Sequence, residues 1–574
     1  MHGIFFVLLV MSVVFYKERL FADGVYYFFH VVNSGWFHVE HGRIVLGIGQ
    51  ILPVIASQLQ IPIQFIAIIS SFGHELFYYL LFLFITIKLK NRNLGIAFLL
   101  AHLIGQLWLY FTPMYEICYG GALALVFYGL LTSPKIEDDK WKLAMVFCLW
   151  FALTSHLENT VVLFYLILFD ILERKFIRPL HLPVLILLFI GIGIELLTLS
   201  SYELSNLENP FDEDASFLNL FKPDYLLALF KLFLNYYPEI LIFNVFSILF
   251  LAVKSKWKTL VVFIGANASL ILAINNKANA IDFIRYFESM YYPLVVLCVF
   301  TFLFSVYKLL SKQVMLLTGT LLLLCMGVRL VWISSYGIAL KERSLQIIGL
   351  VDQLQLIPER DKAVINKANI VKSIDLINWA LPIEAMVFSS FDGPNESISL
   401  VTYDQITYNK KDKGLDTSNF LFREDEIMPL RDLNGRYFSL SKNLYKPVNT
   451  AKNIANLDVI GNNLKVQFLA SNLEVTKGDS SYFRVRIENK SELSLPSSLD
   501  EKIFLSYHIY DSANDVIVWD GKRTPIQIDI SDEFHQNIVV KSPDKAGAFK
   551  IVPDLVVEGE KWMNLKELSN LNVR

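Results

Sequence analysis

Charged residues are scarce in this sequence. They make up 18% of the 574 residues, whereas a soluble globular chain usually carries about 25%. The shortage is confined to the part before about residue 336, because charged residues reach an ordinary frequency after it. Two chemically different regions therefore share one chain, and the first is too apolar to be an ordinary soluble domain.

Cysteine is also rare, and none of it lies in the more polar second region. The four cysteines fall inside apolar segments, without a C-x-x-C pair: Cys118, Cys148, Cys298 and Cys325. This distribution excludes a disulfide framework and a thiolate metal site. We expect all four to be small hydrophobic core residues.

Motifs for phosphate and nucleic-acid chemistry are missing as well. The chain has no Walker-type loop, no G-x-G-x-x-G loop and no long basic run, and its net charge is only −3. These absences disfavour nucleotide chemistry and a nucleic-acid partner.

Long hydrophobic segments, by contrast, are abundant, and 54% of the residues are hydrophobic. A bilayer core of about 30 Å requires roughly 20 apolar helical residues for each crossing. We identify eleven candidate spans, several of them short, at residues 3–16, 62–87, 94–111, 117–131, 143–153, 160–172, 182–199, 238–253, 259–274, 290–307 and 314–334. The sequence therefore predicts a mainly α transmembrane bundle of about 11 helices over residues 1–335.

Basic residues set the expected orientation of this bundle. Short alternate connections hold about 14 Lys and Arg, whereas the longer ones in between hold about 7. The basic connections are expected to face the cytoplasm. The N-terminus is then cytoplasmic, the three longest connections are external, and everything after residue 335 is periplasmic if the membrane is a bacterial inner membrane. Lys17 and Arg19 do not fit, because they fall on the external side.

The rest of the chain is predicted to hold two further regions. Residues 336–450 mix a helical pattern at 344–356 with strand-like runs at 385–390 and 397–403, which suggests a mixed α/β region. Residues 451–574 show repeated alternation of apolar and polar residues, bounded by Gly, Pro, Asn and Asp. That pattern is typical of an antiparallel β-sandwich.

Residues 451–574 also resemble an immunoglobulin-like module of bacterial envelope-polysaccharide proteins. The matching segments are IENKSELSLPS at 487–497, LSYHIYD at 505–511, VWDGKRTPI at 518–526 and VVEGEKW at 556–562. Aromatic rings stack on sugars and carboxylates bind hydroxyls, so the candidate carbohydrate surface comprises Trp519, Asp520, Arg523 and Trp562. The plain alternative is that both tryptophans are core or turn residues and that Asp520 and Arg523 brace a hairpin.

Ionisable residues gather in the connections predicted to be external. The candidates are Asp23, His38, Glu40, His41, Arg43, Glu116, His156, Glu158, Arg285 and Glu288. Convergence of such groups from separate loops is what an outward-facing active site requires. The plain alternative is ordinary solvated loop residues, although Asp23 and Arg285 stand in aromatic, apolar sequence. His74 and Glu75 lie in mid-span, where a hydrogen-bonded contact within the bundle and a proton or substrate path are equally open.

Three features in residues 3–334 resemble the GT-C superfamily of membrane glycosyltransferases. Asp23 follows the first span, next to Tyr26 and Tyr27; an amphipathic stretch covers residues 42–59; and Arg285-Tyr286 precedes a span that contains a proline. One departure is that Asp23 is followed by Gly24 and not by a second acidic residue. Metal dependence and the assignment of the base are therefore open.

The resemblance implies inverting transfer of a sugar from a polyprenyl-phosphate donor to an envelope glycan, lipid or protein acceptor. Asp23 would be the general base, since an aspartate is ionised at neutral pH. Arg285 would stabilise the leaving phosphate. Substrate-binding roles are also expected for Arg43 and Glu288. Glu116, His156 and Glu158 would position sugar hydroxyls or hold a divalent cation such as Mg or Mn.

Three other readings remain open. A transporter or flippase for lipid-linked sugars would show internal repeats, broken helices and charges deep in several spans. The sequence shows no convincing repeat, and only His74, Glu75 and His102 are clearly deep. A non-catalytic envelope assembly protein would work mainly through the C-terminal region. An O-antigen polymerase or ligase is a close enzymatic neighbour of the favoured reading.

Overall fold

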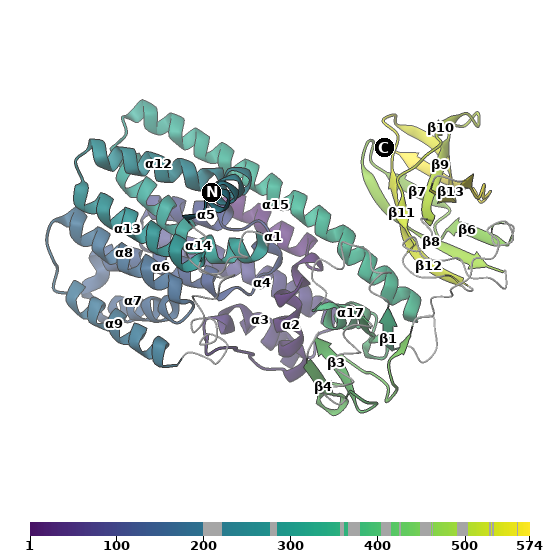
Figure 1. Ribbon diagram of the computed structural model, residues 1–574, viewed down its shortest axis with the longest axis horizontal. Helices are drawn as coiled ribbons and strands as arrows, with labels where there is room; N and C mark the ends of the chain where they lie inside the picture. Colours follow the sequence, from purple (N-terminus) through teal and green to yellow (C-terminus); the bar gives the residue numbers. More distant parts are fainter. Residues whose placement is uncertain are drawn as a thin grey trace. The chain divides into compact units, whose positions relative to one another are not determined.

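The computed structural model describes most of the chain in two compact units (Figure 1). The first unit comprises Met1–Ile61 and Phe65–Ile338, and the second comprises Pro62–Gln64 and Ala339–Arg574. Outside the described residues lie 199–220, 276–283, 356–360, 366–378, 403–414, 424–425, 448–460, 462, 491–502, 527–529, 531–532 and 559–560, together with the side chains of 284–287, 353 and 561.

The first unit is helical. Its helices are α1 (His2–Val14), α2 (Asp23–Ser34), α3 (Leu46–Gln58), α4 (Ile63–Leu83), α5 (Arg92–Ile104), α6 (Glu116–Thr132), α7 (Asp139–Leu153), α8 (Leu157–Arg174), α9 (His181–Leu197), α11 (Pro223–Tyr236), α12 (Pro238–Val253), α13 (Trp257–Ile274), α14 (Ile284–Thr301) and the start of α15 (Lys312–Gln355). The helix α6 packs against α7, α8 and α14, and nearly all of its side chains are buried. It is therefore a central element of this unit.

A helix covers most of each segment predicted to be a span, but fewer helices are long enough to cross a membrane. Four described helical stretches are both long and apolar enough: Ile63–Lys88, Trp257–Ile274, Glu288–Leu309 and Lys312–Asp352. The bent pair α11 and α12 would make a fifth. The prediction of about 11 transmembrane helices exceeds this number. The physical reason is length, because a helix of 13 residues such as α1 or α5 extends only about 20 Å.

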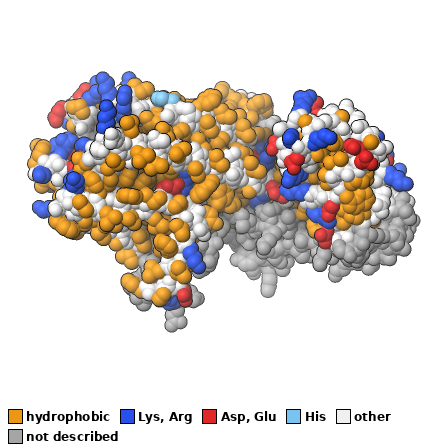
Figure 2. Space-filling model, turned by 90° about the horizontal axis from the view of Figure 1, so that it is seen from above, with side chains coloured by type: hydrophobic (Ala, Val, Ile, Leu, Met, Phe, Trp, Pro, Cys, Tyr) orange, Lys and Arg blue, Asp and Glu red, His pale blue; other side chains and the backbone are white. Residues whose placement is uncertain are grey.

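Apolar side chains cover much of the exposed surface of the first unit. Figure 2 shows hydrophobic residues over most of the visible face, with Lys and Arg gathered toward one end. Large exposed hydrophobic residues occur on α9, α12 and α15, among them Phe189, Phe246 and Leu316. An exposed apolar surface of this kind suits contact with lipid, and would be unusual in water.

At the sharp bend between α11 and α12, a side chain supplies a hydrogen-bond partner for the backbone carbonyl that the bend leaves free. The two helices meet at 104°. Arg329 of α15 donates from Nη2 to the carbonyl oxygen of Tyr236 at 2.7 Å and from Nε to Glu239 at 2.8 Å. A backbone carbonyl released by a bend needs a partner when no water is near. Arg329, fully buried, supplies it.

The second unit begins within α15 and contains a small parallel sheet. Strands β1 (Lys362–Ile365), β2 (Ser399–Thr402) and β5 (Lys446–Pro447) pair in the order β2-β1-β5, and both pairings are parallel. Helix α17 (Leu381–Ser389) lies between β1 and β2 in the chain, while β3 (Asn419–Arg423) and β4 (Glu426–Pro429) form a hairpin. The strand predicted at 385–390 is wrong. Every residue of α17 is buried, and a short apolar run without polar alternation does not distinguish a buried helix from a strand.

Two further sheets share one hydrophobic core in residues 461–574. Strands β12 (Glu533–Lys541), β8 (Ser480–Asn489) and β6 (Leu464–Phe468) form one sheet. The other is ordered β10 (Val516–Val518), β9 (Ile503–Tyr510), β13 (Gly547–Val557), β15 (Ser569–Val573), β7 (Asn472–Val475), with β11 (Thr524–Pro525) and β14 (Lys561–Trp562) attached. Val485, Ile538, Leu505 and Ile551 from both sheets belong to the same core. The pairing is not purely antiparallel as predicted, because β15 and β7 run parallel.

Candidate functional site

Asp23 is the first residue of α2, where a carboxylate is favoured by the positive end of the helix dipole. The turn before it is unusual. Ala22, fully buried, has a φ of 51°, a conformation that residues other than glycine rarely adopt. Non-glycine residues in such conformations are held by their surroundings and are found often at functional sites. Asp23 is therefore presented by a tight, constrained turn.

Two polar contacts connect the start of α6 with Asp23 and with the segment before α3. The hydroxyl of Tyr115 donates to Oδ2 of Asp23 at 2.8 Å. Glu116, the next residue, forms an ion pair with Arg43, and both side chains are largely buried. Three segments distant in sequence thus meet here. Asp23, Arg43 and Glu116, all predicted to be site residues, are brought into one region.

Tyr27 and Glu40 complete the group. Burial raises the pKa of the Tyr27 hydroxyl well above its usual value, and the nearby charges of Glu40 and Asp23 raise it further. The side chain of His38 lies 3.4 Å from Glu40, and Tyr26 donates to the same carboxylate. These hydrogen bonds lower the pKa of Glu40 to about 2, the His38 contact having the largest effect. Glu40 is therefore ionised at neutral pH. We refer to Asp23, Tyr27, Glu40, Arg43, Tyr115 and Glu116 as the Asp23 cluster.

A small cavity lies beside the Asp23 cluster, between α2, α3, α4 and the segment before α6. Its lining includes Tyr27, Gln50, Ser71 and Met114. Gly49 also lines it, and a Cβ at that position would lie 2.1 Å from the Tyr119 hydroxyl oxygen. The glycine at residue 49 therefore leaves room for the Tyr119 hydroxyl where α3 meets α6.

His156 and Glu158 lie at the N-terminal end of α8. Nδ1 of His156 is 3.2 Å from Glu158, so the two residues pair with each other. Asn159 of the same turn donates to the carbonyl oxygen of Ile117 at 3.0 Å. Because Ile117 follows Glu116, the pair lies near the end of α6 that carries the Asp23 cluster.

Glu288 is placed differently from the expected external loop. It lies in α14, is 1% exposed, and accepts hydrogen bonds from the backbone amides of Leu107 and Leu109. This geometry suits a structural role in holding the turn between α5 and α6. Arg285 lies in the first turn of α14, and its side chain falls outside the described residues.

The residues proposed for a divalent cation do not come together as a ligand set. Within the described part of the chain, no three His, Cys, Asp or Glu side chains are grouped as a metal site requires. Glu116 faces Arg43, and His156 faces Glu158. We therefore derive no step through a metal at the Asp23 cluster.

A buried ionic network lies next to the turn that carries Asp23. Nη2 of Arg19 is 3.3 Å from Glu75, and Nε2 of His102 is 3.2 Å from the other oxygen of the same carboxylate. None of the three is more than 1% exposed. Arg19 was expected in an external loop, against the charge rule, and the structure instead buries it within the helical unit. The sequence held a signal for part of the network, because Glu75 and His102 both fall inside predicted spans, but it held none for Arg19.

The four candidate carbohydrate-binding residues of the second unit also come together. Trp519 stacks on His508 with ring centroids 4.1 Å apart, and Trp562 lies 6.2 Å from Trp519. Arg523 lies over the Trp562 ring and pairs with Asp520 and Glu558. Trp519 remains 47% exposed. Both earlier interpretations retain support, because Asp520 and Arg523 brace a turn while Trp519 offers aromatic surface.

Comparison with known proteins adds no relative: the chain matches no protein-family model and no curated protein.

Proposed function

We propose that this protein is a membrane-embedded glycosyltransferase. It would move a sugar from a polyprenyl-phosphate donor to an envelope glycan, lipid or protein acceptor on the outer, periplasmic face of a bacterial inner membrane. The observation that carries the proposal is the Asp23 cluster, in which the half-buried Asp23 carboxylate accepts a hydrogen bond from Tyr115, and the next residue, Glu116, pairs with Arg43. The GT-C resemblance of the first 334 residues supports the same reading.

In this mechanism the acceptor hydroxyl oxygen attacks the anomeric carbon of the donor sugar. Its proton passes to the carboxylate of Asp23, while the bond from that carbon to the phosphate oxygen breaks. The electron pair leaves with the polyprenyl phosphate. Tyr115 donates to Asp23 and so orients the base.

Arg43 is the cationic member of the Asp23 cluster, and it is suited to binding the donor phosphate. A guanidinium binds phosphate through parallel hydrogen bonds and stabilises the charge that grows on the leaving group. In the structure its partner is Glu116. Donor binding would exchange that carboxylate for the phosphate, and Glu116 would then be free to accept a hydrogen bond from a sugar hydroxyl.

The test is sugar transfer in membranes that contain the full-length protein, using a panel of labelled polyprenyl-phosphate hexoses. We expect Asp23→Asn to lower the transfer rate about 10²- to 10⁴-fold, the usual contribution of a general base. Asp139→Asn is the matched control, because Asp139 is 94% exposed and pairs with Lys142. Transfer by Asp23→Asn at the wild-type rate would exclude the mechanism.

Transport of a lipid-linked sugar is the second candidate. The observation that favours it is the Arg19–Glu75–His102 network, since ionisable groups inside a membrane bundle often belong to a transport path. Flux of labelled lipid-linked sugar in proteoliposomes separates the two functions. Flux in both the wild type and Asp23→Asn, with no sugar transfer by either, would favour the transporter.

A further inference from the structure

A polar cleft lies at the turn between α4 and α5, away from the Asp23 cluster. Its volume is about 390 Å³, and it is lined by residues from two segments. The first segment runs from Leu89 to Asn93, and the second comprises Gly129 and residues 132–134. Except for Gly129, which lies in the predicted span 117–131, these residues belong to the predicted cytoplasmic connections or their edges.

Two cations line this cleft without a carboxylate partner. Lys90 and Arg92 are both exposed, and within the described residues neither forms an ion pair. A third cation is close, because Nζ of Lys135 donates to the carbonyl oxygen of Lys88 at 3.0 Å. Unpaired positive charge around a polar hollow favours an anion, and a guanidinium beside an ammonium suits a phosphate group.

The acidic residues nearby do not neutralise this charge. Asp138 lies 3.1 Å from Lys140, and Asp139 lies 2.9 Å from Lys142. Glu137 is exposed and does not line the cleft. The local carboxylates that could compete with a bound anion are therefore mostly occupied by other lysines.

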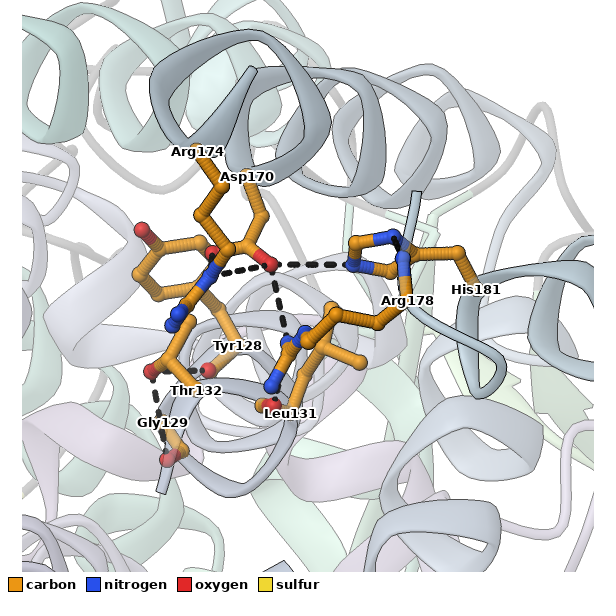
Figure 3. Close-up of polar contacts among 8 residues, drawn as sticks. All are labelled: Tyr128, Gly129, Leu131, Thr132, Asp170, Arg174, Arg178 and His181. Atoms are coloured by element: carbon orange, nitrogen blue, oxygen red, sulfur yellow. Dashed lines mark hydrogen bonds and ion pairs between the residues drawn. The ribbon is translucent and has the colours of Figure 1, made fainter. Parts of the chain in front are cut away.

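The walls of the cleft are held by hydrogen bonds. Oδ1 of Asn91 caps α5 by accepting from the amide of Leu94 at 3.1 Å, so the positive end of that helix faces the cleft edge. At the other wall, Arg178 donates to the carbonyl oxygen of Leu131 at 2.7 Å. Figure 3 shows that Arg178 is itself fixed by Asp170, which also binds Arg174 and His181. The C-terminal end of α6 is thereby anchored to α8 and α9.

The position along α4 indicates the source of the anion. The helical stretch Ile63–Lys88 is long enough to cross a bilayer, and the cleft begins at the next residue. Trp141 packs on Phe84 with centroids 5.9 Å apart and lies 5.2 Å from Nζ of Lys135. Tryptophan and lysine at the end of a spanning helix are typical of the level of lipid headgroups.

We propose that this cleft binds the phosphate of an anionic phospholipid headgroup. Lys90 and Arg92 hold the phosphate, and the acyl chains remain in the bilayer beside α4. The site lies in the basic end of the helical unit and is independent of the sugar-transfer proposal.

The test uses full-length protein in detergent and measures retention of phosphatidylglycerol against phosphatidylcholine by native mass spectrometry. The double variant Lys90→Gln/Arg92→Gln should weaken phosphatidylglycerol binding roughly 30-fold, at about fivefold for each basic residue near an anionic surface. The matched control is Lys140→Gln/Lys142→Gln, which removes the same charge from the same end but not from the cleft. The control should stay within about twofold of wild type on the same scale.

Three outcomes would overturn the proposal. Equal weakening in both double variants would show a general charge effect. Unchanged binding in Lys90→Gln/Arg92→Gln would place the lipid elsewhere. Displacement of the lipid by an equal concentration of glycerol 3-phosphate or inorganic phosphate would identify a free phosphate as the ligand. Lys90 and Arg92 are both exposed, so the double variant is expected to fold normally. Circular dichroism checks that its helical content equals that of the wild type.

Discussion

A Cβ atom at Gly24 would lie 2.5 Å from the carbonyl oxygen of Arg19. No real side chain tolerates that distance from a backbone atom, so residue 24 must be glycine for the turn before α2 to close. The same relationship explains why Asp23 is not followed by a second acidic residue. A paired-carboxylate motif at this position is excluded by the backbone, and Asp23 has to act with groups from other segments.

The substitution Gly24→Ala should therefore displace the Asp23 turn. We expect a loss of about 1–3 kcal/mol of stability from overpacking, together with a large fall in sugar transfer. Differential scanning fluorimetry and the transfer assay measure the two effects. Ala22→Gly is the matched control two residues earlier, because it relieves a positive φ of 51° and should leave stability unchanged or raise it. Equal loss in both variants would contradict the argument.

The ion pair between Arg19 and Glu75, next to the turn that carries Asp23, should contribute to the stability of the first unit. Glu75→Gln leaves two buried cationic or polar partners, Arg19 and His102, without their carboxylate. Removing one member of a buried pair costs about 3–5 kcal/mol. Thermal unfolding in detergent should show a clearly lower Tm. Glu173→Gln is the control, since its partner Lys256 is partly exposed and such pairs contribute about 0–1 kcal/mol. Similar Tm values for the two variants would contradict this role.

Glu40 should make the first unit sensitive to acid. Its pKa is lowered from 4.5 to about 2, mainly by the hydrogen bond with His38. A carboxylate with a lowered pKa stabilises the fold above its unfolded pKa, and this contribution is lost as pH falls toward the folded value. The Tm difference between wild type and Glu40→Gln should therefore be largest near neutral pH and shrink between about pH 4.5 and pH 2.

Tyr26→Phe tests the source of this effect, because it removes one donor to Glu40 and keeps the carboxylate. The stability that the Glu40 carboxylate contributes near neutral pH should be smaller than in the wild type, and its loss should be complete at a higher pH, because the folded pKa lies closer to the unfolded one. A difference between wild type and Glu40→Gln that does not change with pH would rule out the Glu40 linkage.

The helix positions could be predicted from the sequence, but the number of spans could not. Long apolar runs indicate buried or membrane-facing helices. The predicted spans 238–253 and 259–274 therefore correspond closely to α12 and α13. Run length does not fix helix length, because capping and turn contacts end a helix early. The helix α5 ends at Ile104, whereas the apolar run extends to residue 111. The helix α2 was missed because its aromatic residues are buried by tertiary packing, which local pattern does not report.

Some residues of the candidate site could be predicted from the sequence, but their pairing could not. Asp23, Arg43 and Glu116 stood out because charges in apolar sequence require partners, and the structure brings them together. Which residues pair could not be predicted, since the Arg43–Glu116 contact joins positions 73 residues apart. Tyr115 could not be predicted, because nothing in the sequence around it shows that its hydroxyl donates to Asp23.

The surface around Trp519 provides the last prediction. One side of the Trp519 ring is stacked on His508, and the residue is still 47% exposed. If this surface binds glycan, Trp519→Ala should weaken binding of envelope polysaccharide by the full-length protein about two- to tenfold, since an aromatic stacking contact contributes about 0.5–1.5 kcal/mol beyond its area. Isothermal calorimetry measures it. Trp36→Ala is the control, because Trp36 is 61% exposed in the first unit. A lower Tm with unchanged affinity in Trp519→Ala would mean that the ring only covers His508 and that the hairpin interpretation is correct.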